Sequence, residues 1–215
     1  MNSCLLCATP IRLRLSFSDI FLSRQTQQVI CQSCFMQFEY ISDRHCEVCY
    51  KPDISGVCQD CKLIKNPVMH RAIFHYNDFA KIYFKQYKFN GDFRLRAAFN
   101  QILRLNLKGQ QIIPIPVSAE RLQSRGFNQV TGFLSSANLP YLALLSKIET
   151  EHQSHKTRVA RLSTDNPFRL NTSSKLPDSV LIFDDIYTTG TTLKHAIAII
   201  KNAGCPRVST FSLFR

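Results

Sequence analysis

The chain has 215 residues with 45% hydrophobic content, and 27 Lys and Arg residues against 15 Asp and Glu residues give it a net charge of +12. This length holds one medium domain and a small appendage, and the hydrophobic content excludes a disordered chain. No apolar run approaches the ~18 residues that a membrane-spanning helix needs, and the first residues lack the pattern of a secretion signal. We therefore expect a cytoplasmic protein without membrane insertion.

Cysteine divides the chain, because eight of the nine cysteines form four C-x-x-C pairs within the first 61 residues. Without a secretion signal such pairs stay reduced, and each supplies two corners of a tetrahedral Zn²⁺ site, with a disulfide framework as the alternative. The simplest arrangement is sequential. One structural zinc ion is then held by Cys4, Cys7, Cys31 and Cys34, and a second by Cys46, Cys49, Cys58 and Cys61. We expect a double zinc-ribbon domain over residues 1–62 and a larger domain over residues 63–215.

Charge divides the chain at the same place. The first 62 residues contain six basic and six acidic residues, so the whole net charge of +12 lies beyond residue 62. Polyanions are therefore expected partners of the larger domain. Charge alone does not choose between nucleic acid and a small phosphorylated molecule.

A basic, aromatic segment covers residues 79–89, after a short strand expected at residues 72–76 and a helix cap expected at Asp78. Two interpretations stay open. Lysines interleaved with aromatic rings could form a stacking platform and an electrostatic track for single-stranded nucleic acid. Alternatively, an amphipathic helix buries the rings and leaves the lysines in solvent. The candidates for DNA contact, here and in the following helix, are Lys81, Lys85, Lys88, Arg94 and Arg96.

Two arginines follow a strand that contains prolines. A helix is predicted after the turn at residues 90–92 by an apolar stripe with helical spacing, made of Phe93, Leu95, Phe99, Ile102 and Leu103. Residues 112–117 predict the strand, where two prolines exclude a regular central ladder and a cis peptide is one option. Arg121 and Arg125 would then lie near the carboxyl edge of the sheet, where a guanidinium fork suits a pyrophosphate. Surface solubility is the alternative explanation.

The last part of the chain alternates strands and helices. Residues 141–148 predict another strand, and the polar residues 149–166 predict a ligand-contacting loop or a disordered connection. The continuous apolar run at residues 180–183 predicts a strand buried on both faces of a parallel sheet. A helix after Thr192 is closed by Gly204, and residues 208–214 predict the closing strand. This alternation predicts a three-layer α/β fold with a mainly parallel sheet and right-handed crossovers.

The loop before that helix lies at the carboxyl edge of the predicted sheet, where α/β proteins bind ligands. Asp184 and Asp185 could accept hydrogen bonds from ribose hydroxyls and attract Mg²⁺. The turn that follows suits a phosphate, because its amides and hydroxyls are hydrogen-bond donors and its glycine allows close approach. The residues of this turn are Thr188, Thr189, Gly190, Thr191 and Thr192. A buried strand that ends in a merely polar turn is the alternative.

Residues 180–192 closely resemble the phosphoribosyl-pyrophosphate (PRPP) motif of type I phosphoribosyltransferases. The resemblance implies that Asp184 and Asp185 bind the ribose and that residues 188–192 hold the 5′-phosphate. It also implies a phosphoribosyltransferase-like fold for the larger domain and Mg²⁺-PRPP as its ligand. We expect Arg121 or Arg125 to bind the pyrophosphate.

The order of motifs along the whole chain is similar to that of the ComF family. After the C-x-x-C pairs come Lys-Phe-Asn-Gly-Asp at residues 88–92, Pro-Ile-Pro at residues 114–116 and Arg-Gly-Phe-Asn-Gln at residues 125–129. The resemblance implies a late competence protein that handles incoming single-stranded DNA beside a ComFA-type helicase, at the cytoplasmic face of the uptake machinery. One position departs from the family pattern, because Ala160 stands where a glutamine is usual.

Three functions fit these residues. The favoured one is assistance in the uptake or handling of single-stranded DNA during natural transformation, on a scaffold that binds PRPP. The second is an active phosphoribosyltransferase that works by electrostatics and positioning, for which no segment indicates an acceptor pocket or the catalytic residues. The third is a PRPP-sensing adaptor whose zinc ribbons contact a partner protein.

Overall fold

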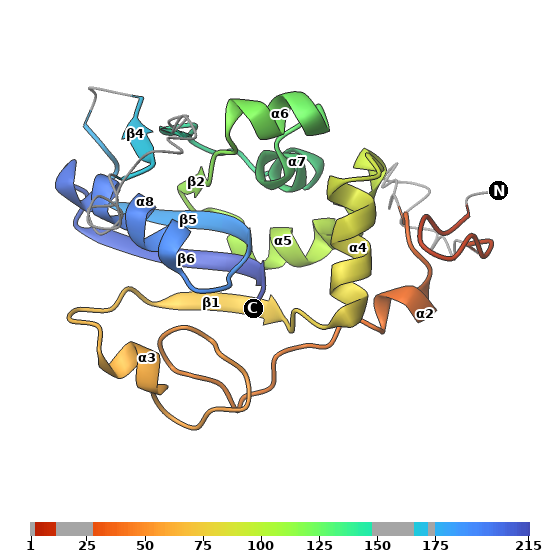
Figure 1. Cartoon of the computed structure of the whole chain (residues 1–215), viewed down its shortest axis with the longest axis horizontal. Coiled ribbons are helices and arrows are strands. Elements are labelled where there is room, and N and C mark those ends of the chain that lie inside the picture. Colours follow the sequence, from red (N-terminus) through yellow and green to blue (C-terminus); the bar gives the residue numbers. More distant parts are fainter. Residues whose placement is uncertain (1–2, 12–27, 148–165, 172–174) are drawn as a thin grey trace, which may run out of the picture.

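The computed structural model describes residues 3–11, 28–147, 166–171 and 175–215. Within these residues the main sheet has four strands in the order β1-β6-β5-β2, and every neighbouring pair is parallel (Figure 1). The strands are β1 (His70–Phe74), β2 (Ile112–Pro114), β5 (Ser179–Ile186) and β6 (Arg207–Phe214). The predicted parallel sheet is confirmed, and the strand expected to close it lies between β1 and β5.

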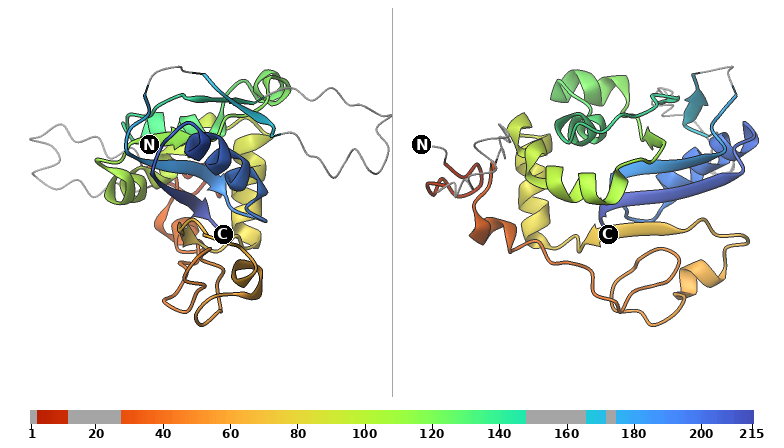
Figure 2. Two further views of the ribbon diagram at one scale, coloured as in Figure 1. Left: turned by 90° about the vertical axis from the view of Figure 1, so that its left-hand side faces the viewer. Right: turned by 180° about the vertical axis from the view of Figure 1, so that it is seen from behind.

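Alternate residues of β5 face two different hydrophobic cores. Val180 and Ile182 belong to the core formed with α8 (Thr191–Asn202). Leu181 and Phe183 belong to a larger, aromatic core on the other face. A strand buried in this way on both faces is the central layer of a three-layer α/β fold. Figure 2 shows the same arrangement from the end of the sheet and from behind.

The larger core is covered by α4 (Asp78–Lys88), the 3-10 helix η1 (Phe93–Phe99), α5 (Asn100–Leu107) and α7 (Gln129–Ser136). The predicted helix over residues 93–103 is thus two elements, and from Leu95 to Phe99 the 3-10 part alternates buried and half-buried positions. Asn77 rather than Asp78 caps α4, because the Asn77 side-chain oxygen accepts a hydrogen bond from the Ala80 amide at 2.9 Å. The strand expected at residues 72–76 lies two residues earlier.

The strands near the prolines differ from their prediction. β2 is a three-residue edge strand, as the prolines require, but the described residues contain no cis peptide bond. The apolar run at residues 141–148 predicts a strand of the main sheet, yet it meets β2 only through the bond from the Leu142 amide to the Ile112 carbonyl, at 2.8 Å. It then forms β3 (Leu145–Lys147), which pairs antiparallel with β4 (Phe168–Leu170).

The cysteine-rich segment contains two short helices, α2 (Gln32–Phe35) and α3 (Gln59–Lys62). Phe38, which follows α2, is 2% exposed and packs among the core rings of Phe74 and Phe99, with ring centroids 5.8 and 5.0 Å away. The neighbouring residue Tyr40 forms an antiparallel bridge with Phe74 beside β1. The segment is therefore packed into the larger core and along the outer edge of the sheet.

No helix in the described part of the chain is long and apolar enough to cross a membrane. The segment expected to be a ligand-contacting loop, residues 149–166, lies outside the described residues apart from Asn166. The Asn166 amide donates a hydrogen bond to the His195 carbonyl on α8, at 2.8 Å.

Candidate functional site

The acid pair lies at the carboxyl end of β5. Asp184 and Asp185 are within the last three residues of the strand, whereas the sequence placed them in the loop after it. Asp184 is in register with Ser212 of β6, and Phe183 with Pro114 of β2. The acids therefore lie at the edge of the sheet where the carboxyl ends of neighbouring strands meet.

The turn between β5 and α8 presents hydroxyl groups and backbone amides. The hydroxyls of Thr189 and Thr191 lie 3.0 Å apart, and both residues are exposed. Gly190 has a φ of 76° and begins α8 without a capping side chain. A β-carbon at Gly190 would collide with the ring of Tyr187, so glycine is required here. The uncapped first amides of α8 suit an anion.

The two carboxylates have different partners. The Lys88 ammonium lies 2.6 Å from the Asp185 carboxylate, and both side chains are largely buried. The Asp184 carboxylate accepts a hydrogen bond from the backbone amide of Asp185, at 2.9 Å. Burial, and next the charge of Asp185, raise the pKa of Asp184 to about 8. A bound cation would favour the ionised form of Asp184.

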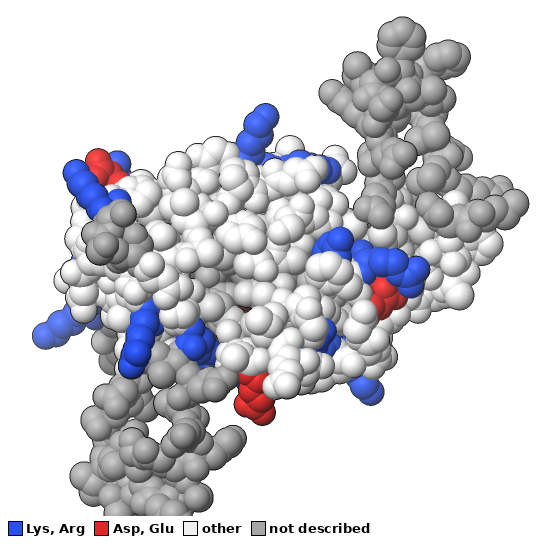
Figure 3. Space-filling view, turned by 90° about the horizontal axis from the view of Figure 1, so that it is seen from above, with Lys and Arg blue, Asp and Glu red and all other residues white. Residues whose placement is uncertain are grey.

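Further cations lie close to the acids. Arg121 and Arg125 are on α6 (Ala119–Arg125), and Lys147 ends β3. Burial and the charge of Arg121 lower the pKa of Lys147, and Asp184 opposes this shift. Burial and Arg121 likewise lower the pKa of Arg125, against the effect of Asp185. Together with Lys88 these side chains form the basic rim of the acid pair. Figure 3 shows Lys and Arg side chains at several places on the face of the molecule that lies at the top of Figure 1.

The candidates for DNA contact have different environments. Lys81 pairs with Asp78 at 2.8 Å, and Arg94 pairs with Asp92 at 3.0 Å. Lys85 is exposed, and Arg96 covers the ring of Phe93, at 3.5 Å from its centroid. Lys88 instead faces the acid pair, as described above. The structure thus separates Lys88 from the solvent-facing members of the set.

The aromatic residues of this region also divide into two groups. Tyr83, Phe84 and Tyr87 are buried in the core, so for these three the amphipathic-helix interpretation is correct. Phe89 and Phe93 are 72% and 36% exposed. The Arg125 guanidinium lies 5.2 Å from the centroid of Phe89. We call Phe89, Phe93 and the arginines over them, Arg96 and Arg125, the aromatic surface.

The eight paired cysteines form two groups, with the sequential membership that the spacing predicts. One consists of Cys4, Cys7, Cys31 and Cys34, and the other of Cys46, Cys49, Cys58 and Cys61, with the four sulfur atoms of each within 4.8 Å of one another. A tetrahedral Zn²⁺ with bonds of about 2.3 Å would place its sulfur ligands about 3.8 Å apart. The Cys7–Cys31 and Cys49–Cys58 sulfur pairs lie 3.6 and 3.7 Å apart. Four thiolates in this geometry fit a structural zinc ion.

Arg215 connects the second cysteine group to the turn between β5 and α8, which we call the phosphate turn because its sequence predicts a phosphate site. Its Nε donates a hydrogen bond to the Cys49 carbonyl and its Nη1 donates one to the Thr188 carbonyl, each at 3.0 Å. Its Nη2 lies 3.5 Å from the Cys49 sulfur, and the guanidinium covers the ring of Tyr187, 4.4 Å from its centroid. Hydrogen bonds of this kind orient metal ligands from outside the coordination sphere.

Four of these residues were not predicted in their observed places. Lys88 was expected only as a DNA contact, although it opens the motif at residues 88–92 and so had a sequence signal. Tyr187 lies directly before the predicted turn, but its contact with Gly190 depends on the three-dimensional path. Lys147 ends β3 and Arg215 directly follows β6, and each is a single charge after a mainly apolar segment.

Comparison with known proteins gives concordant results. A family model described as "Phosphoribosyl transferase domain" matches residues 94–215. "Competence protein ComFC" of Streptococcus pneumoniae is 41% identical over 99% of both chains, and that of Bacillus subtilis is 29% identical over 99% of this chain and 94% of its own. "Competence protein F" of Haemophilus influenzae is 24% identical over 86% of this chain and 88% of its own. The chain thus belongs to the ComFC family of competence proteins, built on a phosphoribosyltransferase fold.

Proposed function

We infer that this protein handles single-stranded DNA during natural transformation and that its scaffold binds Mg²⁺-PRPP. The observation that carries this function is the convergence of three features at one sheet edge: the acid pair, the hydroxyl-rich turn with its basic rim, and the adjoining aromatic surface. Arg125 belongs to both the rim and the aromatic surface. The name of the relatives supplies the biological process.

PRPP binds to both the acid pair and the turn that follows it. Asp184 and Asp185 accept hydrogen bonds from the ribose hydroxyls and favour Mg²⁺ through their carboxylate oxygens. The 5′-phosphate meets the first amides of α8 and the hydroxyls of Thr189 and Thr191. The pyrophosphate group lies against Arg121 and Arg125, whose guanidinium forks bind paired oxygens.

Single-stranded DNA binds to the aromatic surface. Bases stack on the exposed ring of Phe89 and on Phe93, while Lys85, Arg94 and Arg96 follow the phosphate backbone. The buried aromatic rings of α4 support this surface from beneath and do not contact DNA. In the cytoplasm this surface would receive the incoming strand from a ComFA-type helicase.

The test is fluorescence anisotropy of a labelled oligothymidylate of about 20 nucleotides, titrated with the zinc-loaded protein. Binding should weaken steeply between about 50 and 200 mM salt. Saturating Mg²⁺-PRPP should change the affinity several-fold, because the pyrophosphate and the strand both use Arg125. Absence of binding, or binding that salt does not weaken, would contradict the DNA role.

Transformation efficiency then links the site to the process. Cells that produce the Asp184→Asn/Asp185→Asn variant, whose new side chains have nearly the same size but carry no charge, should transform poorly. An unchanged transformation efficiency would show that transformation does not need the acid pair.

Phosphoribosyl transfer is the second candidate, and the basic rim favours it. Arg121, Arg125 and Lys147 could stabilise a departing pyrophosphate while an acceptor attacks C1 of the ribose. Release of pyrophosphate from Mg²⁺-PRPP, measured with nucleobases or oligonucleotides as acceptors, tests this activity. Release no faster than from the Asp184→Asn/Asp185→Asn variant would exclude it for those acceptors.

A further inference from the structure

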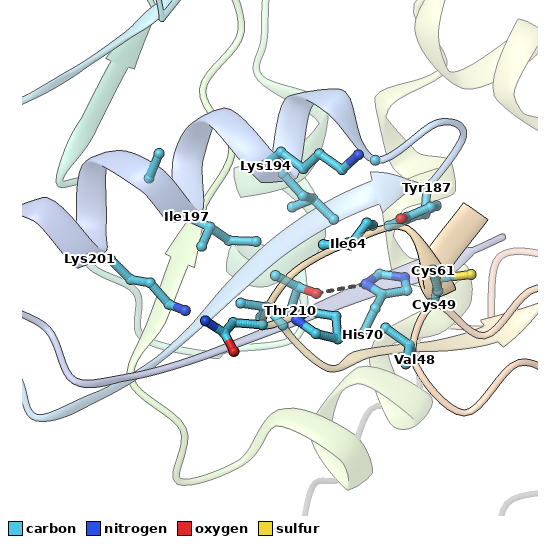
Figure 4. A pocket seen from close by; sticks show the side chains of 16 residues that line it. Val48, Cys49, Cys61, Ile64, His70, Tyr187, Lys194, Ile197, Lys201 and Thr210 are labelled. Carbon is cyan, nitrogen blue, oxygen red and sulfur yellow. Dashed lines mark hydrogen bonds between the residues drawn. The ribbon is translucent and has the colours of Figure 1, made fainter. Parts of the chain in front are cut away.

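A cavity lies away from the acid pair, between the second cysteine group and α8. It has a volume of about 210 Å³. Figure 4 shows Lys194, Ile197 and Lys201 of α8 on one side and Val48 and Cys49 on the other. We call this cavity the ribbon pocket. It lies over His70 of β1 and Thr210 of β6, with α8 and the second cysteine group beside it.

The floor of the ribbon pocket is aromatic and neutral. His70 is 2% exposed, and its ring nitrogens lie 2.9 Å from the Thr210 hydroxyl and 3.1 Å from the Ser212 hydroxyl. The ring of Tyr187 lies against it, with centroids 4.4 Å apart. Burial, with a smaller effect of Arg215, lowers the pKa of His70 to about 3, so the ring carries no charge at neutral pH. A planar, uncharged group would find matching surfaces there.

The walls are aliphatic and the rim is cationic. Ile64 and Val48 face Ile197 across the cavity. Lys194 and Lys201 are exposed, lie seven residues apart, and thus share one side of α8 about 10 Å apart along its axis. Neither forms an ion pair with any acidic residue in the described part of the chain. Two unpaired cations beside an apolar cavity favour an anion at its mouth.

We propose that the ribbon pocket binds a small planar aromatic molecule that carries one anionic group, such as a carboxylate, sulfonate or phosphate. The aromatic body lies between Ile64 and Ile197 above the His70 ring, and the anion lies at Lys201 and Lys194. An apolar cavity of about 150 Å³ accommodates benzene, so the ribbon pocket has room for one or two fused rings. Sites of this kind, mostly apolar with a few polar groups, are typical of small-molecule binding where two structural units meet.

The position of the ribbon pocket also connects it to the phosphate turn. Tyr187 and Gly190 line the cavity, and both belong to the turn before α8. A ligand that orders Tyr187 would therefore change the affinity of the turn for PRPP, and PRPP would change the affinity of the ligand by the same factor. This coupling rests on the proposed PRPP function, whereas ligand binding itself does not.

The binding test uses naphthalenesulfonate as the probe, with uncharged naphthalenemethanol for comparison, and the zinc-loaded full chain. Calorimetry should show that Lys194→Gln/Lys201→Gln weakens naphthalenesulfonate binding about tenfold and leaves naphthalenemethanol binding unchanged. Ile197→Trp fills the cavity and should abolish both. Should that variant fail to fold, Ala198→Phe blocks the cavity from an exposed position of the same helix. Lys108→Gln, an exposed lysine after α5, is the matched control.

Three results would overturn the binding proposal: no binding of the probe at millimolar concentration, unchanged binding by the double lysine variant, or unchanged binding by the blocked variants. The coupling is measured by repeating the PRPP titration with saturating probe, where at least a threefold change is expected. If PRPP binds equally with and without the probe, the proposed coupling is wrong, and the ribbon pocket binds its ligand independently of PRPP. If PRPP does not bind in either condition, the proposed function fails and the probe data remain valid.

Discussion

The side chain of Arg215 holds Cys49 from two directions, donating from Nε to its carbonyl oxygen at 3.0 Å and placing Nη2 at 3.5 Å from its sulfur. The remaining arm of the same guanidinium donates to the carbonyl of Thr188. A cysteine of the second group and the phosphate turn are therefore connected by one rigid planar group. If the second cysteine group loses its structure, the phosphate turn should therefore change its shape as well.

Replacing Arg215 by lysine should weaken Mg²⁺-PRPP binding about five- to tenfold. A single ammonium cannot reach the Cys49 and Thr188 carbonyls together, so the turn loses one of its supports. Calorimetry measures the affinity, and Arg71→Lys on the exposed side of β1 provides the control. Equal PRPP affinity in the Arg215 variant and the wild type would show that the turn keeps its shape without this link.

Metal analysis should find about two zinc ions per chain. Cys58→Ala should leave one ion, because only the second group loses a thiolate. Cys205→Ala should keep both, because Cys205 is buried against α8 and bonds the Pro177 carbonyl at 3.1 Å, far from either group. Chelation should unfold the cysteine-rich segment, seen as a lower melting temperature. A wild-type protein that contains no zinc after purification in zinc-supplemented medium would contradict the assignment.

The raised pKa of Asp184 predicts a specific dependence of stability on pH. Its carboxyl group has a pKa of 3.8 when unperturbed and about 8 in the folded protein, so between these values the folded state holds a proton that the unfolded state has lost. The free energy of unfolding should therefore fall as pH rises through this window, by at most about 1.4 kcal/mol per pH unit from this group.

Asparagine at position 184 removes that dependence. In buffer without Mg²⁺ or PRPP, Asp184→Asn should differ least from the wild type near pH 4 and should exceed its stability by a growing margin up to pH 8, as measured by urea unfolding. The exposed Asp178 supplies the control, because Asp178→Asn should keep the wild-type slope. Parallel curves for wild type and Asp184→Asn across this range would mean that Asp184 ionises normally.

Removing the ring of Phe89 should weaken binding of single-stranded DNA by roughly 1–3 kcal/mol while leaving its salt dependence unchanged, because stacking is lost and no charge is removed. The exposed Leu105 on α5 provides a matched control, since Leu105→Ala removes a comparably exposed apolar side chain at another place. Arg94→Gln should instead reduce the slope of affinity against salt by about 0.7. Equal affinities for Phe89→Ala and Leu105→Ala would place the DNA elsewhere.

The elements whose determinants are local could be predicted from the sequence. Val180 and Ile182 alternate with Leu181 and Phe183 between two cores, which a continuous apolar run requires. The cysteine groups follow from pair spacing, because each C-x-x-C unit brings two sulfurs to one metal. The fold class could be predicted because strand and helix patterns alternate along the sequence of the larger domain.

Features that depend on the tertiary path were not predictable in this way. The run at residues 141–148 has the composition of a main-sheet strand, yet it pairs with β4, whose three residues carry no strong signal. Asn77 and Asp78 are both good capping residues, and only the entry direction of the chain selects Asn77. Lys88 reaches Asp185 across nearly a hundred residues of sequence, a contact that no local pattern encodes.

The packing of Phe38 among the core rings has a consequence for any attempt to divide the protein. A fragment that starts at residue 63 would leave the rings of Phe74 and Phe99 facing solvent and would leave the outer edge of β1 unpaired, where Tyr40 and Ile41 now lie. Such an exposed edge invites association with other chains. The cysteine-rich segment thus covers apolar surface that the phosphoribosyltransferase fold would otherwise expose, and protein prepared for biochemistry should retain it.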